Sequence, residues 1–111
     1  MEAKDLYPKL ETFIGGYFNQ NWFDFVPRGE ANREDYIVRD MLRRESRAIL
    51  LDLTEEISRL LASGVSEADL RRIIKYEFVG HIDPVLDGST FRAWLEHVKE
   101  RIDEHLKFSL R

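Results

Sequence analysis

The sequence predicts an all-α fold, a single-domain bundle of about five helices that spans residues 1–111. Apolar residues recur at the three- and four-residue spacing of one helical face along most of the chain. Serine or asparagine followed three residues later by aspartate marks helix starts, and glycine marks helix ends. A chain of 111 residues is large enough for one hydrophobic core but too small for two. We therefore expect one helical domain without internal repeats.

The first helix is expected to begin near Pro8, because proline suits the first turn of a helix. Its apolar face is the stripe Leu10, Phe13, Ile14, Tyr17 and Phe18. Gly15 and Gly16 lie away from this stripe, and each glycine inside a helix costs about 1 kcal/mol relative to alanine. The glycine pair therefore indicates either that this part of the helix is poorly ordered or that another segment or protein packs closely against its backbone. We expect the segment 22–26 to cover both glycines, and a partner protein is the alternative.

Two helices are expected in the middle of the chain. Asn32 and Asp35 form a start that resembles a capping box, and the stripe that follows is Ile37, Val38, Met41 and Leu42. Ser46 is placed to cap a third helix, which Gly64 ends. The apolar face of this third helix is Leu50, Leu53, Ile57, Leu60 and Leu61. Residues 32–63 also fit one long helix, so the sequence leaves both possibilities open.

Two further helices complete the predicted bundle. Ser66 and Asp69 repeat the capping signature, ahead of the stripe Leu70, Ile73, Ile74 and Phe78. The last helix has the clearest stripe, made of Phe91, Trp94, Leu95, Val98, Ile102 and Leu106. Lys107 and Arg111 lie near its negative end. The turn-forming residues between the helices predict two longer loops, at 24–31 and 79–88.

The composition describes a soluble chain without disulfides. Hydrophobic residues make up 43% of the chain, charged residues make up 34%, and cysteine is absent. No apolar run approaches the roughly 20 residues of a membrane helix, and the N-terminal MEAKDLYPKL lacks the apolar core of a secretory signal. We therefore expect a cytoplasmic protein that does not bind a membrane. The net charge of -4 argues against general nucleic-acid binding and favours a basic partner.

Motifs for catalysis, metal binding and cofactor binding are missing from the sequence. No two of His81, His97 and His105 are four residues apart, and there are no thiols to complete a zinc site. A nucleophile elbow, a phosphate-binding glycine loop and a dinucleotide fingerprint are also absent. We expect no catalytic residue, no metal, no cofactor and no small-molecule substrate. Glu77 lies on an apolar stripe, where burial would make it a proton donor unless the helix frays and its carboxylate reaches water.

One stretch resembles a DNA-binding motif. Residues 62–74, ASGVSEADLRRII, have the glycine and spacing of the tight turn in a helix-turn-helix. A recognition helix presents its first turn to the DNA groove, and here that turn carries Glu67 and Asp69, which repel phosphate. Arg71 and Arg72 come only one turn later. Helix capping explains the same residues, so a DNA-binding regulator is the remoter alternative and we expect no nucleic-acid partner.

Several stretches in order form a pattern that covers nearly the whole chain. They are YPKLETFIGGYFNQNWF at 7–23, an acidic middle with two helices, SGVSEADL at 63–70, and DGSTFRAWLEHVKERI at 87–102. Together they resemble the small helical immunity proteins of bacterial contact-dependent growth inhibition systems. The most specific parts are the aromatic-glycine-aromatic block that ends at Trp22 and the pair Trp94-Leu95. The sequence departs from the family pattern at Asn21, where the family usually has aspartate.

The resemblance implies an antidote and not an enzyme. Such proteins remain in the cytoplasm, bind the toxin domain delivered by a neighbouring cell one-to-one, and block its active site or substrate path. The toxins are often nucleases, whose positive surface would attract an acidic inhibitor. We expect the loops 24–31 and 79–88 to face the toxin, through a candidate set of Tyr17, Trp22, Asp24, Glu30, Asp83 and Asp87. A helical adaptor or regulator that binds some other protein is the alternative.

Overall fold

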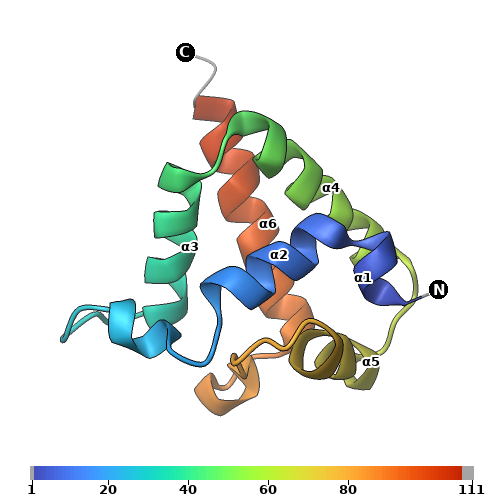
Figure 1. Ribbon diagram of the computed structural model, residues 1–111, viewed down its shortest axis with the longest axis horizontal. Helices are drawn as coiled ribbons and strands as arrows, with labels where there is room; N and C mark the ends of the chain where they lie inside the picture. The colour runs from blue at the N-terminus through green and yellow to red at the C-terminus, as the bar shows by residue number, and fades with distance from the viewer. Residues whose placement is uncertain (1, 109–111) are drawn as a thin grey trace.

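The computed structural model describes residues 2–108, apart from the side chain of Asp87, and this range forms a helical bundle without strands (Figure 1). The predicted all-α class is confirmed. Within the same range, no helix is both long and apolar enough to cross a bilayer. The helices are α1 (Ala3–Leu6), α2 (Pro8–Tyr17), α3 (Arg33–Arg44), α4 (Arg47–Ala62), α5 (Glu67–Arg72) and α6 (Phe91–Phe108). Three single turns join them, η1 (Trp22–Phe25) and η3 (Pro84–Asp87) with 3-10 geometry and η2 (Ile73–Glu77) with π geometry.

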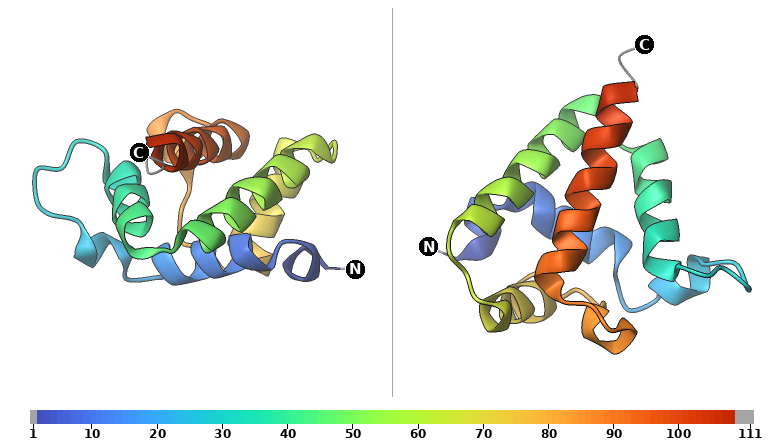
Figure 2. Two further views of the ribbon diagram at one scale, coloured as in Figure 1. Left: turned by 90° about the horizontal axis from the view of Figure 1, so that it is seen from above. Right: turned by 180° about the vertical axis from the view of Figure 1, so that it is seen from behind.

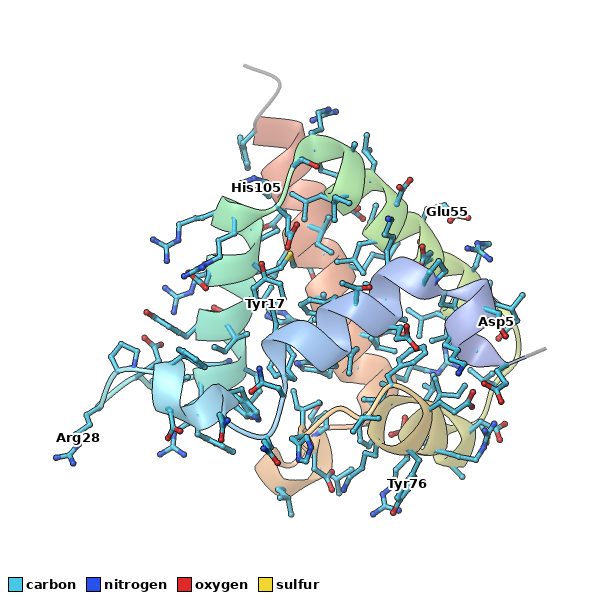
Figure 3. All side chains as sticks on the ribbon, viewed as in Figure 1. Asp5, Tyr17, Arg28, Glu55, Tyr76 and His105 are labelled. Atoms are coloured by element: carbon cyan, nitrogen blue, oxygen red, sulfur yellow. The ribbon has the colours of Figure 1, made fainter. Side chains whose placement is uncertain are left out.

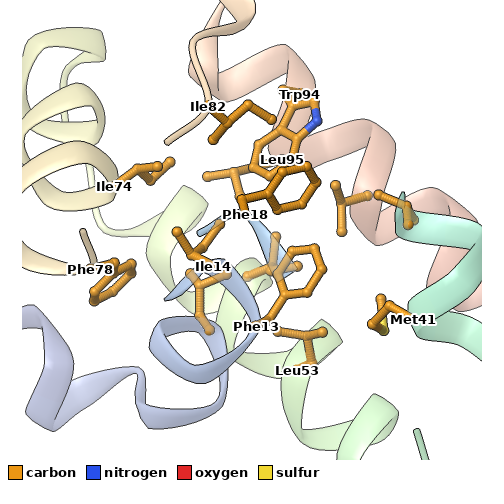
Figure 4. Packing of buried hydrophobic residues seen from close by; sticks show 14 of the residues in the cluster. Phe13, Ile14, Phe18, Met41, Leu53, Ile74, Phe78, Ile82, Trp94 and Leu95 are labelled. Carbon is orange, nitrogen blue, oxygen red and sulfur yellow. The ribbon is translucent and has the colours of Figure 1, made fainter. Parts of the chain in front are cut away.

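The bundle is arranged around α6. In Figure 1, α2 crosses in front of α6, α3 and α4 flank it, and α5 closes the lower end. The turned views place α2 and α6 on opposite sides of the molecule (Figure 2). Aromatic rings fill the space between them, where Phe18 meets Trp94 edge to face with ring centroids 5.2 Å apart (Figure 4). The aromatic block that carries the family resemblance is therefore a core-forming element.

Short polar side chains start the helices where the sequence predicts them. Asn32 Oδ1 accepts a hydrogen bond from the backbone N–H of Asp35 at 3.0 Å, which caps α3. Ser66 and Asp69 form a complete capping box at α5. The backbone is extended at Glu45 and Ser46, and the Ser46 hydroxyl caps α4. This break divides residues 32–63 into two helices and excludes the single long helix.

Three glutamates cap helices to which they do not belong. Glu56, buried in α4, accepts hydrogen bonds from two N–H groups in the first turn of α2 at 2.9 and 3.0 Å. Glu67 accepts two from the start of α6 at 2.6 and 3.0 Å, and Glu77 accepts one from Ala3 in α1 at 3.0 Å. The first N–H groups of a helix have no partner within the helix and attract negative charge. These glutamates therefore fix where three helices begin relative to the elements that pack on them.

The turn η2 changes the interpretation of Glu77. In η2 the backbone hydrogen bonds join residues five positions apart. Glu77 therefore lies beside Arg72, five positions earlier, and the two side chains form an ion pair at 2.6 Å. Its second oxygen caps α1. Glu77 is therefore engaged both in a helix cap and in an ion pair, contacts that neither alternative from the sequence includes. A regular helix, which the stripe predicts, does not place residues five apart on one face.

The two glycines in α2 have different surroundings. A Cβ atom on Gly15 would lie 3.3 Å from the carbonyl oxygen of Phe78, whereas a Cβ on Gly16 would have nothing within 4 Å. The prediction that residues 22–26 cover the pair is wrong, because no atom of that segment comes within 4 Å of either position. Gly15 instead lets the end of η2 approach the backbone of α2. Gly16 faces open space.

Candidate functional site

The two segments predicted to face a partner border one hollow at the lower end of the molecule. We call it the loop hollow. It has a volume of about 770 Å³, and its lining comes from residues 22–34 on one side and 75–86 on the other. A second hollow, of about 840 Å³, lies between α1 and the α5–η2 segment. Tyr76 borders both and points away from the body of the protein (Figure 3).

Backbone hydrogen bonds hold the two sides of the loop hollow together. The indole Nε1 of Trp22 donates to the carbonyl oxygen of His81 at 2.6 Å, and the backbone N–H of His81 donates to the carbonyl of Phe18 at 2.7 Å. Next to His81, Gly80 packs so closely on the Ile14 side chain that a Cβ atom would overlap it. The segment after η2 is therefore fixed against α2 and η1, although about 60 residues separate them in the sequence.

Two of the predicted acids line the loop hollow, and both are already paired. Glu30 forms an ion pair with Arg39 at 3.2 Å, and Asp83 forms one with Lys75 at 3.0 Å. The hydrogen bond from Lys75 holds the pKa of Asp83 below its usual value, so Asp83 is ionised at neutral pH. Asp24 is exposed on η1 outside the lining of this hollow. The side chain of Asp87 lies outside the described part of the structure.

Of the two predicted aromatic anchors, Trp22 lines the loop hollow and Tyr17 does not. Trp22 is only 1% exposed, so it is a core residue and not a surface anchor, although its side chain borders the hollow. Tyr17 borders a different hollow of about 300 Å³ between α2 and α3, where its hydroxyl donates to Glu45 at 2.9 Å. Burial and this hydrogen bond raise the pKa of Tyr17 to about 12. The six predicted residues therefore do not form one cluster.

Sequence reasoning missed the exposed apolar side chains of the two segments that border the loop hollow, of which Phe23, Tyr76 and Leu86 line it. Of the nine large apolar side chains that are exposed within residues 2–108, six come from positions 23–25 and 76–86. They are Phe23, Phe25, Tyr76, Val79, Val85 and Leu86. The signal was present, because Val85 and Leu86 are apolar residues in a predicted loop and belong to no helical stripe.

Comparison with known proteins identifies the family. A family model described as CdiI immunity protein matches residues 6–102, which includes both sides of the loop hollow. The chain belongs to the CdiI immunity protein family. The resemblance found in the sequence is thereby confirmed, including the aromatic block and the pair Trp94-Leu95, which fall within the match.

A solved structure has the same fold as this CdiI family member. In the crystal structure of a CdiA-CT/CdiI complex from Y. kristensenii 33638, one chain superposes with a TM-score of 0.76 at 24% sequence identity. The match covers 87% of the present chain and 98% of the other. No curated protein matches the sequence significantly. The described helices and their order are therefore those of a known fold.

Proposed function

We propose that this CdiI family member neutralises a toxin domain of the CdiA-CT type by forming a one-to-one complex that covers the toxin's active site or substrate path. The observation that carries the proposal is the family match over residues 6–102. The structure from Y. kristensenii adds support, because there a CdiI protein is in complex with CdiA-CT. On this proposal the chain acts in the cytoplasm by occlusion and makes or breaks no covalent bond itself.

The toxin is proposed to be a nuclease. A nuclease presents positive surface to its substrate, and the net charge of -4 suits an inhibitor that approaches such a surface. Protection against a few toxin molecules in a cell requires a dissociation constant on the order of nanomolar, or about 12 kcal/mol of binding free energy. An interface of standard size supplies that amount.

The fold gives no support to the DNA-binding alternative. In a recognition helix the first turn projects into the groove. Here Glu67, in the first turn of α5, accepts hydrogen bonds from the start of α6 and is half-buried there. The residues that suggested a helix-turn-helix are therefore engaged in capping and packing.

Co-expression tests the proposal. The toxin domain encoded beside this chain is produced in bacteria with and without it, and growth is followed while the two polypeptides are co-purified. We expect growth to recover and an equimolar complex to be isolated. Growth arrest despite abundant folded antidote would refute the proposal. A large secreted effector gene immediately upstream would support it, whereas an isolated regulatory operon would favour the adaptor or regulator alternative.

A further inference from the structure

We propose that the toxin domain docks on the apolar rim of the loop hollow, and this inference rests on the function proposed above. The apolar rim consists of Phe23, Tyr76 and Leu86, which line the hollow, and of the exposed Val79, which precedes the lining residue Gly80 in the chain. The occupant is a toxin domain that presents an apolar protrusion bordered by basic side chains. Four observations point to it: the exposure of the rim, a strained valine, the rigid support beneath, and the charge around the hollow.

Exposure is the first observation. Leu86 is 84% exposed and Tyr76 is 68% exposed, so neither contributes its side chain to the core. Large apolar side chains grouped around one concavity are typical of protein-binding surfaces, where aromatic residues in particular are enriched. Of the other exposed large apolar residues of the described chain, Phe25 and Val85 lie in η1 and η3, whereas Leu6, Leu51 and Phe108 are distributed over α1, α4 and α6.

The backbone of Val79 provides the second observation. Its φ angle is 55°, in the left-handed region, which a β-branched residue avoids and where helix ends normally use glycine. Glycine is present one position later, at Gly80, where Ile14 leaves no room for a side chain. Val79 is 61% exposed and gains little from burial in the free protein. A strained backbone conformation that no contact within the protein compensates is a feature of binding sites, where contacts with the partner provide the compensation.

The support beneath the rim is rigid. Val79 lies between Phe78, which is buried in the core, and Gly80, whose N–H donates to the carbonyl of Ile74 at 2.8 Å. On the facing side, Phe23 stacks on the buried Trp22 with ring centroids 4.0 Å apart, and Arg33 lies over the Phe23 ring. A binding surface fixed before the encounter loses less conformational entropy when the complex forms.

Charge identifies the occupant. Segments 22–34 and 75–88 together contain six acidic and three basic residues, so they carry three of the four net negative charges of the chain. An apolar centre with an acidic surround fits a partner with an apolar contact and a basic surround, and a nucleic-acid-cleaving toxin presents basic charge of this kind to its substrate. We expect salt to slow association and rim substitutions to speed dissociation.

Single truncations on the rim provide the first test. Tyr76→Ala and Leu86→Ala are compared with wild type for binding to the adjacent toxin domain by surface kinetics at fixed salt. We expect each variant to bind roughly tenfold more weakly, through a faster dissociation rate. Leu51→Ala is the matched control, because Leu51 is an exposed leucine on α4, a helix that contributes no residue to the lining of the loop hollow, and the affinity of this variant is expected to be unchanged.

Val79→Gly separates docking from folding. Glycine relieves the left-handed backbone and removes the side chain, so the midpoint of urea unfolding is expected to rise while affinity for the toxin falls several-fold. A purely structural role predicts that both quantities change in the same direction, which would overturn the proposal. Circular dichroism confirms that each variant is folded.

The remaining outcomes also decide the question. If wild type binds the toxin tightly and all three rim variants bind as well as Leu51→Ala, the docking surface is wrong while the proposed function stands. If wild type fails to bind the toxin, both fail. If sedimentation shows that wild type is a dimer and that Leu86→Ala makes it monomeric, the rim is a self-association surface and the proposal is overturned.

Discussion

At the scale of single residues, the two tryptophans differ in whether the indole N–H has a hydrogen-bond acceptor. The indole N–H of Trp22 donates to the His81 carbonyl, whereas the buried indole N–H of Trp94 has no partner within the described residues. The sequence predicts that both are apolar and large. It does not reveal which indole reaches an acceptor, because that depends on a contact between segments about 60 residues apart.

The tryptophan pair yields a stability prediction. Trp22→Phe and Trp94→Phe remove the same atoms, but only the first leaves a carbonyl without its donor, which costs about 1–2 kcal/mol. We therefore expect Trp22→Phe to lower the free energy of unfolding by about that much more than Trp94→Phe does, measured by urea titration. Equal losses for both variants would show that the bond to His81 contributes nothing.

Glycines show the same distinction between pattern and packing. The cost of a glycine pair in a helix was predictable, but only the structure separates Gly15, against Phe78, from Gly16, which faces open space. Gly16→Ala is expected to stabilise the protein by about 0.5–1 kcal/mol, because it improves helix propensity without a clash. Gly80→Ala is expected to destabilise it by about 1–3 kcal/mol, because the methyl group overlaps Ile14. Thermal unfolding of the two variants measures both effects.

At the scale of elements, the regular helices were predictable and their exceptions were not. Stripes and caps indicate α2, α3, α4, α5 and α6, because these signals are local in sequence. The helix α1 has four residues, too few for a periodic signal, and its first N–H is bound by Glu77. Both exceptions, α1 and η2, depend on contacts with distant parts of the chain.

Neighbouring glutamates in α4 test the capping of one helix by another. Glu56 is buried and binds the first turn of α2, whereas Glu55 is exposed and pairs only with Arg59 in its own helix among the contacts described. Glu56→Gln is expected to cost about 1–2 kcal/mol of stability, because it removes the charge at the positive end of α2. Glu55→Gln is expected to cost less than about 0.5 kcal/mol. Similar losses in chemical denaturation would contradict this assignment.

An acid network joins α3 to α6 and predicts a pH effect. Asp35 is 16% exposed and accepts hydrogen bonds from Arg101 at 3.0 and 3.1 Å. Burial alone would raise its pKa, but the hydrogen bond with His97 and the charges of Arg101 and Arg39 hold the pKa below its usual value. The stabilisation is therefore complete above the unfolded pKa of about 3.9 and is lost as the pH falls through the folded pKa.

Asp35→Asn measures this contribution. We expect the variant to be less stable than wild type by about 2 kcal/mol at pH 7, because its hydrogen bonds involve charged groups. The difference in stability between wild type and variant is expected to narrow below pH 4, because Asp35 becomes protonated in wild type and loses its charge, whereas the asparagine of the variant does not titrate. Denaturation curves at several pH values provide the measurement, and a constant difference from pH 7 to pH 3 would show that ionisation of Asp35 is not the cause.

At the scale of the whole molecule, the sequence predicts the two loops that border the loop hollow but not which of their side chains face outward. Loops 24–31 and 79–88 border one hollow. The sequence locates both loops because turn residues identify loops without knowledge of packing. Of the candidate residues, Trp22 is buried and Tyr17 lies beside another hollow. The apolar rim cannot be predicted from the sequence, because only the folded structure shows which apolar side chains the core leaves exposed.

Titration of toxin activity tests the central claim most directly. A fixed amount of the adjacent toxin domain is mixed with increasing amounts of this protein, and cleavage of the toxin's substrate is measured. The account predicts a linear loss of activity that is complete at an equimolar ratio, with no turnover of substrate by this protein alone. Full toxin activity in the presence of excess folded protein would contradict it.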